Sequence, residues 1–224
     1  MLPVSLPSFK RISRFDVFYP GKVVVLALIC LPLFDGITAS ADDWPQYQGK
    51  DRDNRSAESG LLTTWPDAGP ALAWTFDTAG TGYSAPAIAD GRAFFMGGRD
   101  GKTELICLEE SSGQELWSIA LNEKIFDFEG NSWGAGPRST PTVDGDRVYA
   151  LTGDGNLACV STEGKLLWTM DLVSQLGGSI KSVDAGEPET YGWGFCWAPI
   201  VDGENLICTP GSADGSGLVV ALDK

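Results

Sequence analysis

A repeated pattern of prolines and turns constrains the fold of this 224-residue chain more than any other feature of its sequence. Three segments carry a proline at their third position and an Asp-Gly pair shortly after it. They read SAPAIADGRAFFMGG from Ser84, STPTVDGDRVYALTG from Ser139 and WAPIVDGENLICTPG from Trp197. The prolines stand at positions 86, 141 and 199, so the spacing is 55 and then 58 residues. Such a period predicts one supersecondary unit per copy.

A second shared element closes on a tryptophan in the first two copies. It reads CLEESSGQELW over residues 107–117 and CVSTEGKLLW over residues 159–168. Each stretch has a polar turn with a glycine before the tryptophan, and these residues are Gly113, Trp117, Gly164 and Trp168. An earlier stretch, ALAWTFD, puts Trp74 in the same place. The repeat therefore extends well beyond its first hairpin.

Turn residues divide each copy into four short strands. The Asp-Gly pairs at 90–91, 144–145 and 202–203 are typical of type I′ hairpin turns, which need positive φ at both central residues. Gly-rich stretches such as GGRDGK and TGDGN predict the second turn, and SSGQ and STEG predict the third. We therefore predict an all-β fold, a β-propeller with four-stranded antiparallel blades at about 84–121, 138–172 and 197–224.

The closing element carries a family resemblance. CLEESSGQELW is similar to the pattern A-x-D-x-x-T-G-K-x-x-W, and the chain resembles exported bacterial propellers with pyrroloquinoline-quinone-type (PQQ-like) repeats over about residues 44–224. In that family this stretch is the tryptophan-docking motif, whose tryptophan packs between neighbouring blades. The resemblance implies a structural docking role for Gly113, Trp117, Gly164 and Trp168.

The last residues begin a third copy of the docking motif. Ala221-Leu222-Asp223 matches its start, and the glycine and tryptophan of that copy are not among the 224 residues. The resemblance also implies that the strand at Trp74 completes a later blade. We therefore expect an N-terminal fragment with about two full blades, part of a third and one closing strand. Missing C-terminal blades of the same chain, or an oligomer, would complete a ring of 4 to 8 blades.

Residues 1–41 are predicted to be a signal peptide, with the propeller domain at 42–224. Four basic residues precede the apolar run VVVLALICLPLF at 23–34, which is shorter than the roughly 20 residues that span a bilayer. Ala39-Ser40-Ala41 then offers a cleavage site. We expect export to the periplasm or the extracellular space. The alternative is an uncleaved N-terminal segment that anchors the protein.

Composition excludes several kinds of site. The chain has no histidine, so it cannot build a Ser-His-Asp triad or a Cys-His pair. The net charge of −14 repels phosphate, so nucleic acid is not an expected partner. Cys107 and Cys159 occupy equivalent positions and are predicted to be buried. With Asp202-Gly203 as the turn, Cys208 is predicted to lie opposite Trp197, and free thiols are expected.

The name of the repeat raises the question of a quinone cofactor. As the resemblance implies, quinoprotein dehydrogenases hold the quinone under a disulfide between adjacent cysteines, near a calcium ion. This chain has no adjacent cysteines, and its nearest calcium-like run, DRDNRSAESG from Asp51, lacks the required ligands and glycine. No catalytic, cofactor-binding or metal-binding residue is predicted. PQQ and calcium are expected as cofactors only if the chain is part of a quinoprotein.

Two long connections between blades are the candidate sites. Residues 122–138 and 173–196 are both longer than about 15 residues, and loops of that length are usually functional or disordered. Both end in aromatic residues and glycines, and the candidate channel-mouth binding residues are Trp133, Arg138, Tyr191 and Trp193. Such side chains are suited to a protein segment, a small planar ligand or a sugar. The alternative is that they only fill space between blades.

Together these observations favour an exported, non-enzymatic propeller that acts as a binding or scaffold protein. By resemblance its nearest functional analogue is the propeller lipoprotein of outer-membrane protein assembly, although fold does not determine function. One alternative is the N-terminal part of a PQQ-dependent oxidoreductase whose catalytic residues lie beyond Lys224. Another is a carbohydrate-binding propeller that uses the aromatic residues at 191–197.

Overall fold

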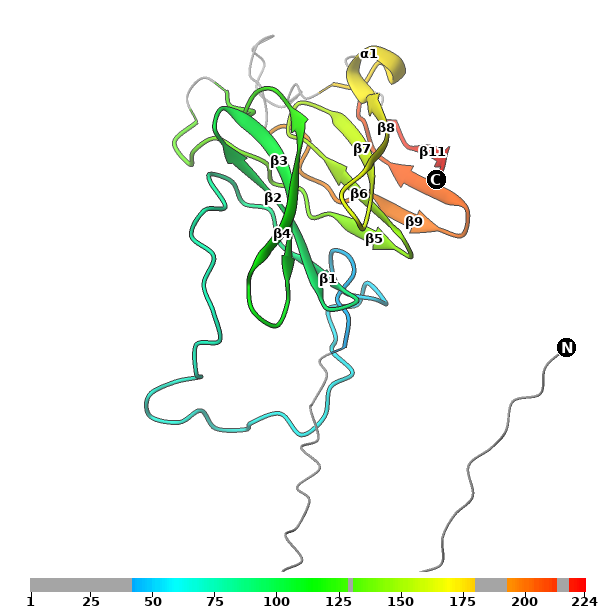
Figure 1. Ribbon diagram of the computed structural model, residues 1–224. Helices are drawn as coiled ribbons and strands as arrows, with labels where there is room; N and C mark the ends of the chain where they lie inside the picture. The colour runs from blue at the N-terminus through cyan, green and yellow to red at the C-terminus, as the bar shows by residue number, and fades with distance from the viewer. Residues whose placement is uncertain (1–41, 129–130, 180–192, 213–217) are drawn as a thin grey trace, which may run out of the picture. The chain divides into compact units, whose positions relative to one another are not determined.

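A computed structural model describes residues 42–128, 131–179, 193–212 and 218–224 (Figure 1). The predicted signal peptide at 1–41 lies outside the described residues, as does Tyr191. Within the part of the chain that is described, no helix is long and apolar enough to cross a membrane.

The first two repeat copies each fold into a four-stranded antiparallel sheet whose strands pair in chain order. Successive strands are joined by hairpins, so each copy is a simple meander. The first sheet consists of β1 (Ala87–Ala89), β2 (Arg92–Arg99), β3 (Lys102–Glu109) and β4 (Glu115–Asn122). The second consists of β5 (Thr142–Asp144), β6 (Arg147–Leu151), β7 (Asn156–Ser161) and β8 (Leu166–Asp171). Four strands per copy is what the turn pattern predicted.

The third copy forms a three-stranded sheet in the order β11-β10-β9. Its strands are β9 (Ile200–Asp202), β10 (Asn205–Cys208) and β11 (Val220–Asp223). The three sheets follow one another in chain order across Figure 1, and the innermost strands β1, β5 and β9 are neighbours. This arrangement, with a short inner strand and a longer second hairpin in each copy, is that of propeller blades.

Equivalent residues occupy equivalent registers in the first two blades. Phe94 on β2 pairs with Cys107 on β3, which pairs with Trp117 on β4. In the second blade Tyr149, Cys159 and Trp168 take the same three places on β6, β7 and β8. The ring pairs also agree, with centroids 6.0 Å apart for Phe94 and Trp117 and 6.1 Å for Tyr149 and Trp168.

The core lies between facing blades. Alternate residues of a strand point to opposite faces, so β6 serves two clusters at once. Val148 and Ala150 pack toward the first blade, beside Phe94 and Cys107. Tyr149 and Leu151 face the third blade, where they join Leu206 and Cys208 among others. Each blade therefore buries its second face only against its neighbour, and the stability of one depends on the next.

The predicted position of the first turn is correct in one copy and wrong by one residue in the second. Asp90 and Gly91 are the central residues of the first hairpin, with φ of 50° and 69°, as a type I′ turn requires. In the second copy Asp144 pairs with Arg147, so the central residues are Gly145-Asp146. A type II′ turn needs positive φ only at its first central residue, and Gly145, at φ 57°, fills that position. Asp144 therefore stays in the strand.

The same shift occurs in the third copy and changes the predicted register. Asp202 pairs with Asn205, and Gly203, at φ 61°, opens the turn. Cys208 therefore lines up with Pro199 and not with Trp197. The predicted outcome for the thiols still holds, because Cys107, Cys159, Cys196 and Cys208 are all unpaired.

A short helix, α1 (Leu172–Leu176), follows β8 directly and was not predicted. Asp171 is its N-cap, and its carboxylate accepts hydrogen bonds from the backbone N–H groups of Val173 and Ser174. These bonds, Ser174 first, lower the pKa of Asp171. Gly177 ends the helix in the left-handed conformation at φ 68°. Leu172 is buried in the core between the second and third blades.

Candidate functional site

Two tryptophans join each blade region to the next in the same way. The Trp117 indole lies on Gly164, and its Nε1 donates a hydrogen bond of 3.0 Å to the carbonyl of Thr162. Trp74 lies on Gly113 and donates a bond of 2.7 Å to the carbonyl of Glu110.

Both glycines are required by close approach as well as by backbone conformation. A Cβ at Gly164 would come within 2.8 Å of the Trp117 ring, and one at Gly113 within 2.5 Å of the Trp74 ring. Their φ angles are 84° and 71°. Trp168 is half-buried against Tyr149, and its docking role stays a prediction.

The N-terminal segment Trp44–Arg52, which we call the N-terminal clasp, contacts the innermost strand of all three blades. Trp44 and Ile88 exchange two backbone hydrogen bonds of 2.9 Å beside β1. The N–H of Val143 on β5 donates to the carbonyl of Pro45 at 2.8 Å.

The far end of the clasp reaches the third blade. Arg52 donates through Nη2 to the carbonyl of Val201 on β9 and through Nε to Gln46 Oε1 at 3.1 Å. Because residues 44–52 form a tight series of turns, one short segment spans the inner edges of three sheets.

The connections predicted to hold a site bring their aromatic residues together. We call Tyr83, Phe128, Trp133, Arg138 and Trp193 the aromatic–arginine cluster. The rings of Trp133 and Trp193 meet edge to face with centroids 6.2 Å apart, and Phe128 meets Trp193 edge to face at 5.6 Å. Edge-to-face contact is a favoured geometry for aromatic pairs. Tyr191, the fourth predicted residue, lies outside the described residues.

Arg138 lies at the centre of this cluster. Its guanidinium carbon is 5.1 Å from the centroid of Tyr83 and 5.3 Å from that of Trp193, within cation–π range of both. Its two terminal nitrogens donate to the carbonyls of Gly136 at 3.0 Å and Gly134 at 2.9 Å. The side chain is therefore held by its own loop before any ligand arrives.

The cluster is open to solvent. Trp133 is 67% exposed, Tyr83 52% and Trp193 47%. Beneath it, Phe126 is buried against Gly153 and Gly194, where a Cβ would come within 2.9 Å of its ring. The exposed rings thus stand on a packed base that joins both long connections to the second blade.

Tyr83 was missed, although the repeat contains a signal for it. Tyr83, Arg138 and Cys196 each stand immediately before the first residue of a copy. Equivalent positions in successive blades lie side by side, and this periodicity could have indicated that Tyr83 is a neighbour of Arg138. The structure adds a hydrogen bond of 2.7 Å from the Tyr83 N–H to the carbonyl of Pro137. Phe128 carries no comparable signal.

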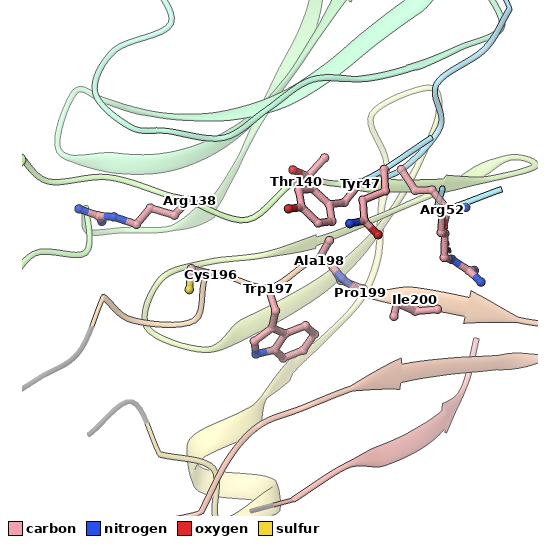
Figure 2. Close-up of a pocket in the computed structure, with 11 residues that line it drawn as sticks. Tyr47, Arg52, Arg138, Thr140, Cys196, Trp197, Ala198, Pro199 and Ile200 are labelled. Atoms are coloured by element: carbon pink, nitrogen blue, oxygen red, sulfur yellow. Dashed lines mark hydrogen bonds between the residues drawn. The ribbon is translucent and has the colours of Figure 1, made fainter. Parts of the chain in front are cut away.

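A pocket of about 470 Å³ lies beside the cluster, between the N-terminal clasp and the start of β9 (Figure 2). Arg138 belongs to both features, at one end of the pocket, and Arg52 is drawn at the other end. The lining consists of Gln46, Tyr47, Gln48, Arg52, Arg138, Thr140, Cys196, Trp197, Ala198, Pro199 and Ile200. No aspartate or glutamate is among these residues.

The described residues do not fit a calcium or quinone site of the kind that the resemblance implies. Nowhere in residues 42–128, 131–179, 193–212 and 218–224 do three or more His, Cys, Asp or Glu side chains converge as metal ligands. None of the four described cysteines is adjacent in sequence to another. No catalytic step through a quinone or a metal follows from this arrangement.

Comparison with known proteins decides the family. A family model described as outer membrane protein assembly factor BamB matches residues 66–184 and 101–224, which together are more than half of the chain. The chain belongs to this family of PQQ-like repeat proteins. No curated protein sequence matches it.

One of the similar solved structures supports the propeller fold of this PQQ-like repeat protein. Quinohemoprotein alcohol dehydrogenase from Comamonas testosteroni matches with a TM-score of 0.54 and 17% identity over 81% of this chain and 25% of that chain. BamB from Moraxella catarrhalis matches with a TM-score of 0.41 and 17% identity over 67% of this chain and 36% of that one. The chain thus spans about a quarter of the dehydrogenase and about a third of BamB, and at 17% identity the likeness to the dehydrogenase concerns the fold alone.

Proposed function

We propose that this PQQ-like repeat protein is exported and works by binding a partner protein through the aromatic–arginine cluster, without chemistry of its own. The observation that carries the proposal is the composition and placement of the cluster. Two exposed tryptophans and an arginine come from the two long connections; Trp193 contacts both Trp133 and Arg138, and Arg138 also contacts Tyr83. Tryptophan, tyrosine and arginine are the residues most enriched in the energetic centres of protein interfaces.

Preorganisation supports the same function. Arg138 is already held by two backbone carbonyls, and Trp193 is held between Phe128 and Trp133. A partner that covers these side chains would therefore lose little additional rotamer freedom on binding. The docking contacts of Trp74 and Trp117 hold neighbouring blade regions together, which is the structural role proposed for the repeated motif.

Site-specific crosslinking in the cells that make the protein would test this proposal. A photo-crosslinking phenylalanine at position 133 should give one defined adduct. The adduct should be lost when the protein that carries the probe at position 133 also carries Trp193→Ala and Arg138→Gln. The same probe at Leu61, which is also exposed and lies outside the cluster, is the control. Equal adducts from both positions, or none from position 133, would contradict the proposal.

Two further assays separate the alternatives. Reconstitution of the full-length protein with PQQ and calcium should give dye-linked dehydrogenase activity if the chain belongs to a quinoprotein oxidoreductase, and none on our proposal. If the protein is a carbohydrate-binding propeller, the parent protein should bind a glycan and the Trp193→Ala variant should not. Glycan binding that survives this substitution would count against that alternative.

A further inference from the structure

We propose that the pocket between the N-terminal clasp and β9 binds an acidic segment of a partner protein, with two carboxylates that flank apolar residues. This inference rests on the proposed binding function and specifies the chemistry of the partner. It adds a charged subsite beside the aromatic–arginine cluster, and Arg138 links the two.

The distribution of basic side chains is the first argument. The chain carries a net charge of −14, and most of its described basic residues lie within ion-pair distance of a carboxylate, namely Arg92, Arg99, Lys102, Lys124, Arg147 and Lys224. Arg52 and Arg138 instead donate to backbone carbonyls and to the Gln46 amide. Neither has an ion pair in the described part of the chain. Both line the same pocket, and no aspartate or glutamate is among the described residues that line it.

Two comparisons sharpen this argument. The other described basic residues without an ion pair, Lys50, Arg55 and Lys165, do not line the pocket. Asp127 is the carboxylate whose pKa Arg138 affects, but hydrogen bonds from Asn131 and the Phe128 N–H lower that pKa more. Arg138 therefore acts on Asp127 through space, but the two side chains form no ion pair among the described residues.

The shape of the pocket is the second argument. In Figure 2, Arg138 and Arg52 are drawn at opposite ends, and Ala198 and Pro199 lie between them. An anion bound at one guanidinium leaves the other uncompensated, whereas an extended segment with two carboxylates reaches both. Because an extended chain advances by about 3.3 Å per residue, a few residues suffice to fill such a groove. Apolar side chains between the carboxylates would lie on the apolar middle of the pocket.

The inner edge of the third blade is the third argument, because it excludes another way of binding a peptide. An exposed strand edge can accept an added strand through its free carbonyls. Here the Ser139 hydroxyl donates to the Trp197 carbonyl at 2.7 Å and the Thr142 hydroxyl to the Pro199 carbonyl at 2.5 Å. Arg52 donates a hydrogen bond to the carbonyl of Val201. These occupied carbonyls favour recognition through side chains at this pocket.

Cys196 provides a direct readout of occupancy. It lines the pocket and is exposed, whereas Cys107, Cys159 and Cys208 are buried. The rate of its alkylation by N-ethylmaleimide can be followed in the full chain by mass spectrometry of the peptide that contains it. The probe is an acetylated and amidated Glu-Leu-Leu-Glu peptide, with the Lys-Leu-Leu-Lys and Gln-Leu-Leu-Gln peptides and succinate as comparisons.

We expect the Glu peptide to slow alkylation of Cys196 at concentrations where the Lys and Gln peptides and succinate do not. Replacement of one arginine should weaken protection by about fivefold, the upper range for an ion pair that is partly open to solvent. Arg52→Gln and Arg138→Gln are the test variants. Arg55→Gln is the matched control, because it removes the same charge from the same region outside the pocket.

Three results would overturn the inference. One is no protection by the Glu peptide at millimolar concentration, and another is equal protection by the Lys peptide. The third is equal protection by succinate, which would assign the pocket to small anions. These outcomes are separate from the crosslinking at position 133. A partner adduct that persists when the pocket fails to bind acidic peptide would leave the proposed function in place and remove only this subsite.

Discussion

Trp117 of the first blade donates a hydrogen bond of 3.0 Å from its indole nitrogen to the carbonyl of Thr162 in the second. Arg92, from the inner hairpin of the first blade, donates to the same carbonyl at 2.8 Å and forms an ion pair with Glu163. One turn of the second blade thus accepts hydrogen bonds from side chains on two strands of the first blade, β4 and β2. The blades are therefore expected to unfold together.

The contact of Trp117 with Gly164 predicts a large cost for any side chain at position 164. Gly164→Ala would add strain at φ 84° and force the Trp117 ring to move, so we expect a loss of about 3 kcal/mol in the free energy of unfolding. Gly91→Ala in the first blade is the control. Gly91 has φ 69° in its type I′ turn with no atom within 4 Å of the added Cβ, so the substitution should cost only about 1 to 2 kcal/mol. Equal losses in urea denaturation would contradict the docking role of Gly164.

Tyr149 predicts a substitution that does not destabilise. Its side chain is fully buried, and among the described groups its hydroxyl has no partner with hydrogen-bond geometry, although Arg147 is close enough to affect its pKa. Phe94 holds the equivalent position in the first blade. Tyr149→Phe should therefore be neutral or stabilising by up to about 1 kcal/mol, and Phe94→Tyr should destabilise by about 1 to 3 kcal/mol. A loss above 1 kcal/mol for Tyr149→Phe, measured by thermal unfolding, would show that Arg147 does bind the hydroxyl.

Burial predicts which thiols react. Removal from water raises the pKa of Cys107 and of Cys208 to about 11, so at pH 8 only about one thiol in a thousand is ionised. Among the described cysteines, we expect iodoacetamide to label Cys196 in the native protein within minutes and the buried three only after unfolding in guanidinium. Rapid native labelling of Cys107 would mean that the first and second blades separate readily.

The cap of α1 predicts a pH-dependent contribution to stability. Hydrogen bonds from Ser174 and Val173 lower the pKa of Asp171 in the folded state, so its contribution is present above the unfolded value of about 3.9. The contribution is lost as pH falls through the lower folded pKa. Asp171→Ala should cost about 1 kcal/mol at pH 7 and less near pH 2, when stability is compared with the parent protein. Asp171→Asn keeps an acceptor that does not titrate, so it should lose stability less steeply with acid. An Asp171→Ala deficit that stays constant down to pH 2 would contradict this account.

Much of the fold and part of the candidate site could be predicted from the sequence. Turn residues and two-residue alternation are local signals, so the four-stranded blades and the two faces of RVYAL were predictable. Long connections that end in aromatics pointed to Trp133, Arg138 and Trp193, which the structure brings into one cluster. The turns at Gly145 and Gly203 were misplaced because an Asp-Gly pair fits either of two hairpin registers. Strand pairing along the whole hairpin selects between them.

By itself the sequence determined the repeat and the strand periodicity, because both are visible in the order of residue types along the chain. It also excluded histidine chemistry, because the composition contains no histidine. Only the tertiary structure decided that the N-terminal clasp reaches β9, where Arg52 binds a carbonyl 149 residues away. It also decided that Tyr83 joins Arg138 and that two arginines, neither of which has an ion pair among the described residues, share one pocket. Such contacts depend on how successive blades stack, and the stacking is set by packing between faces. No local pattern of residues encodes it.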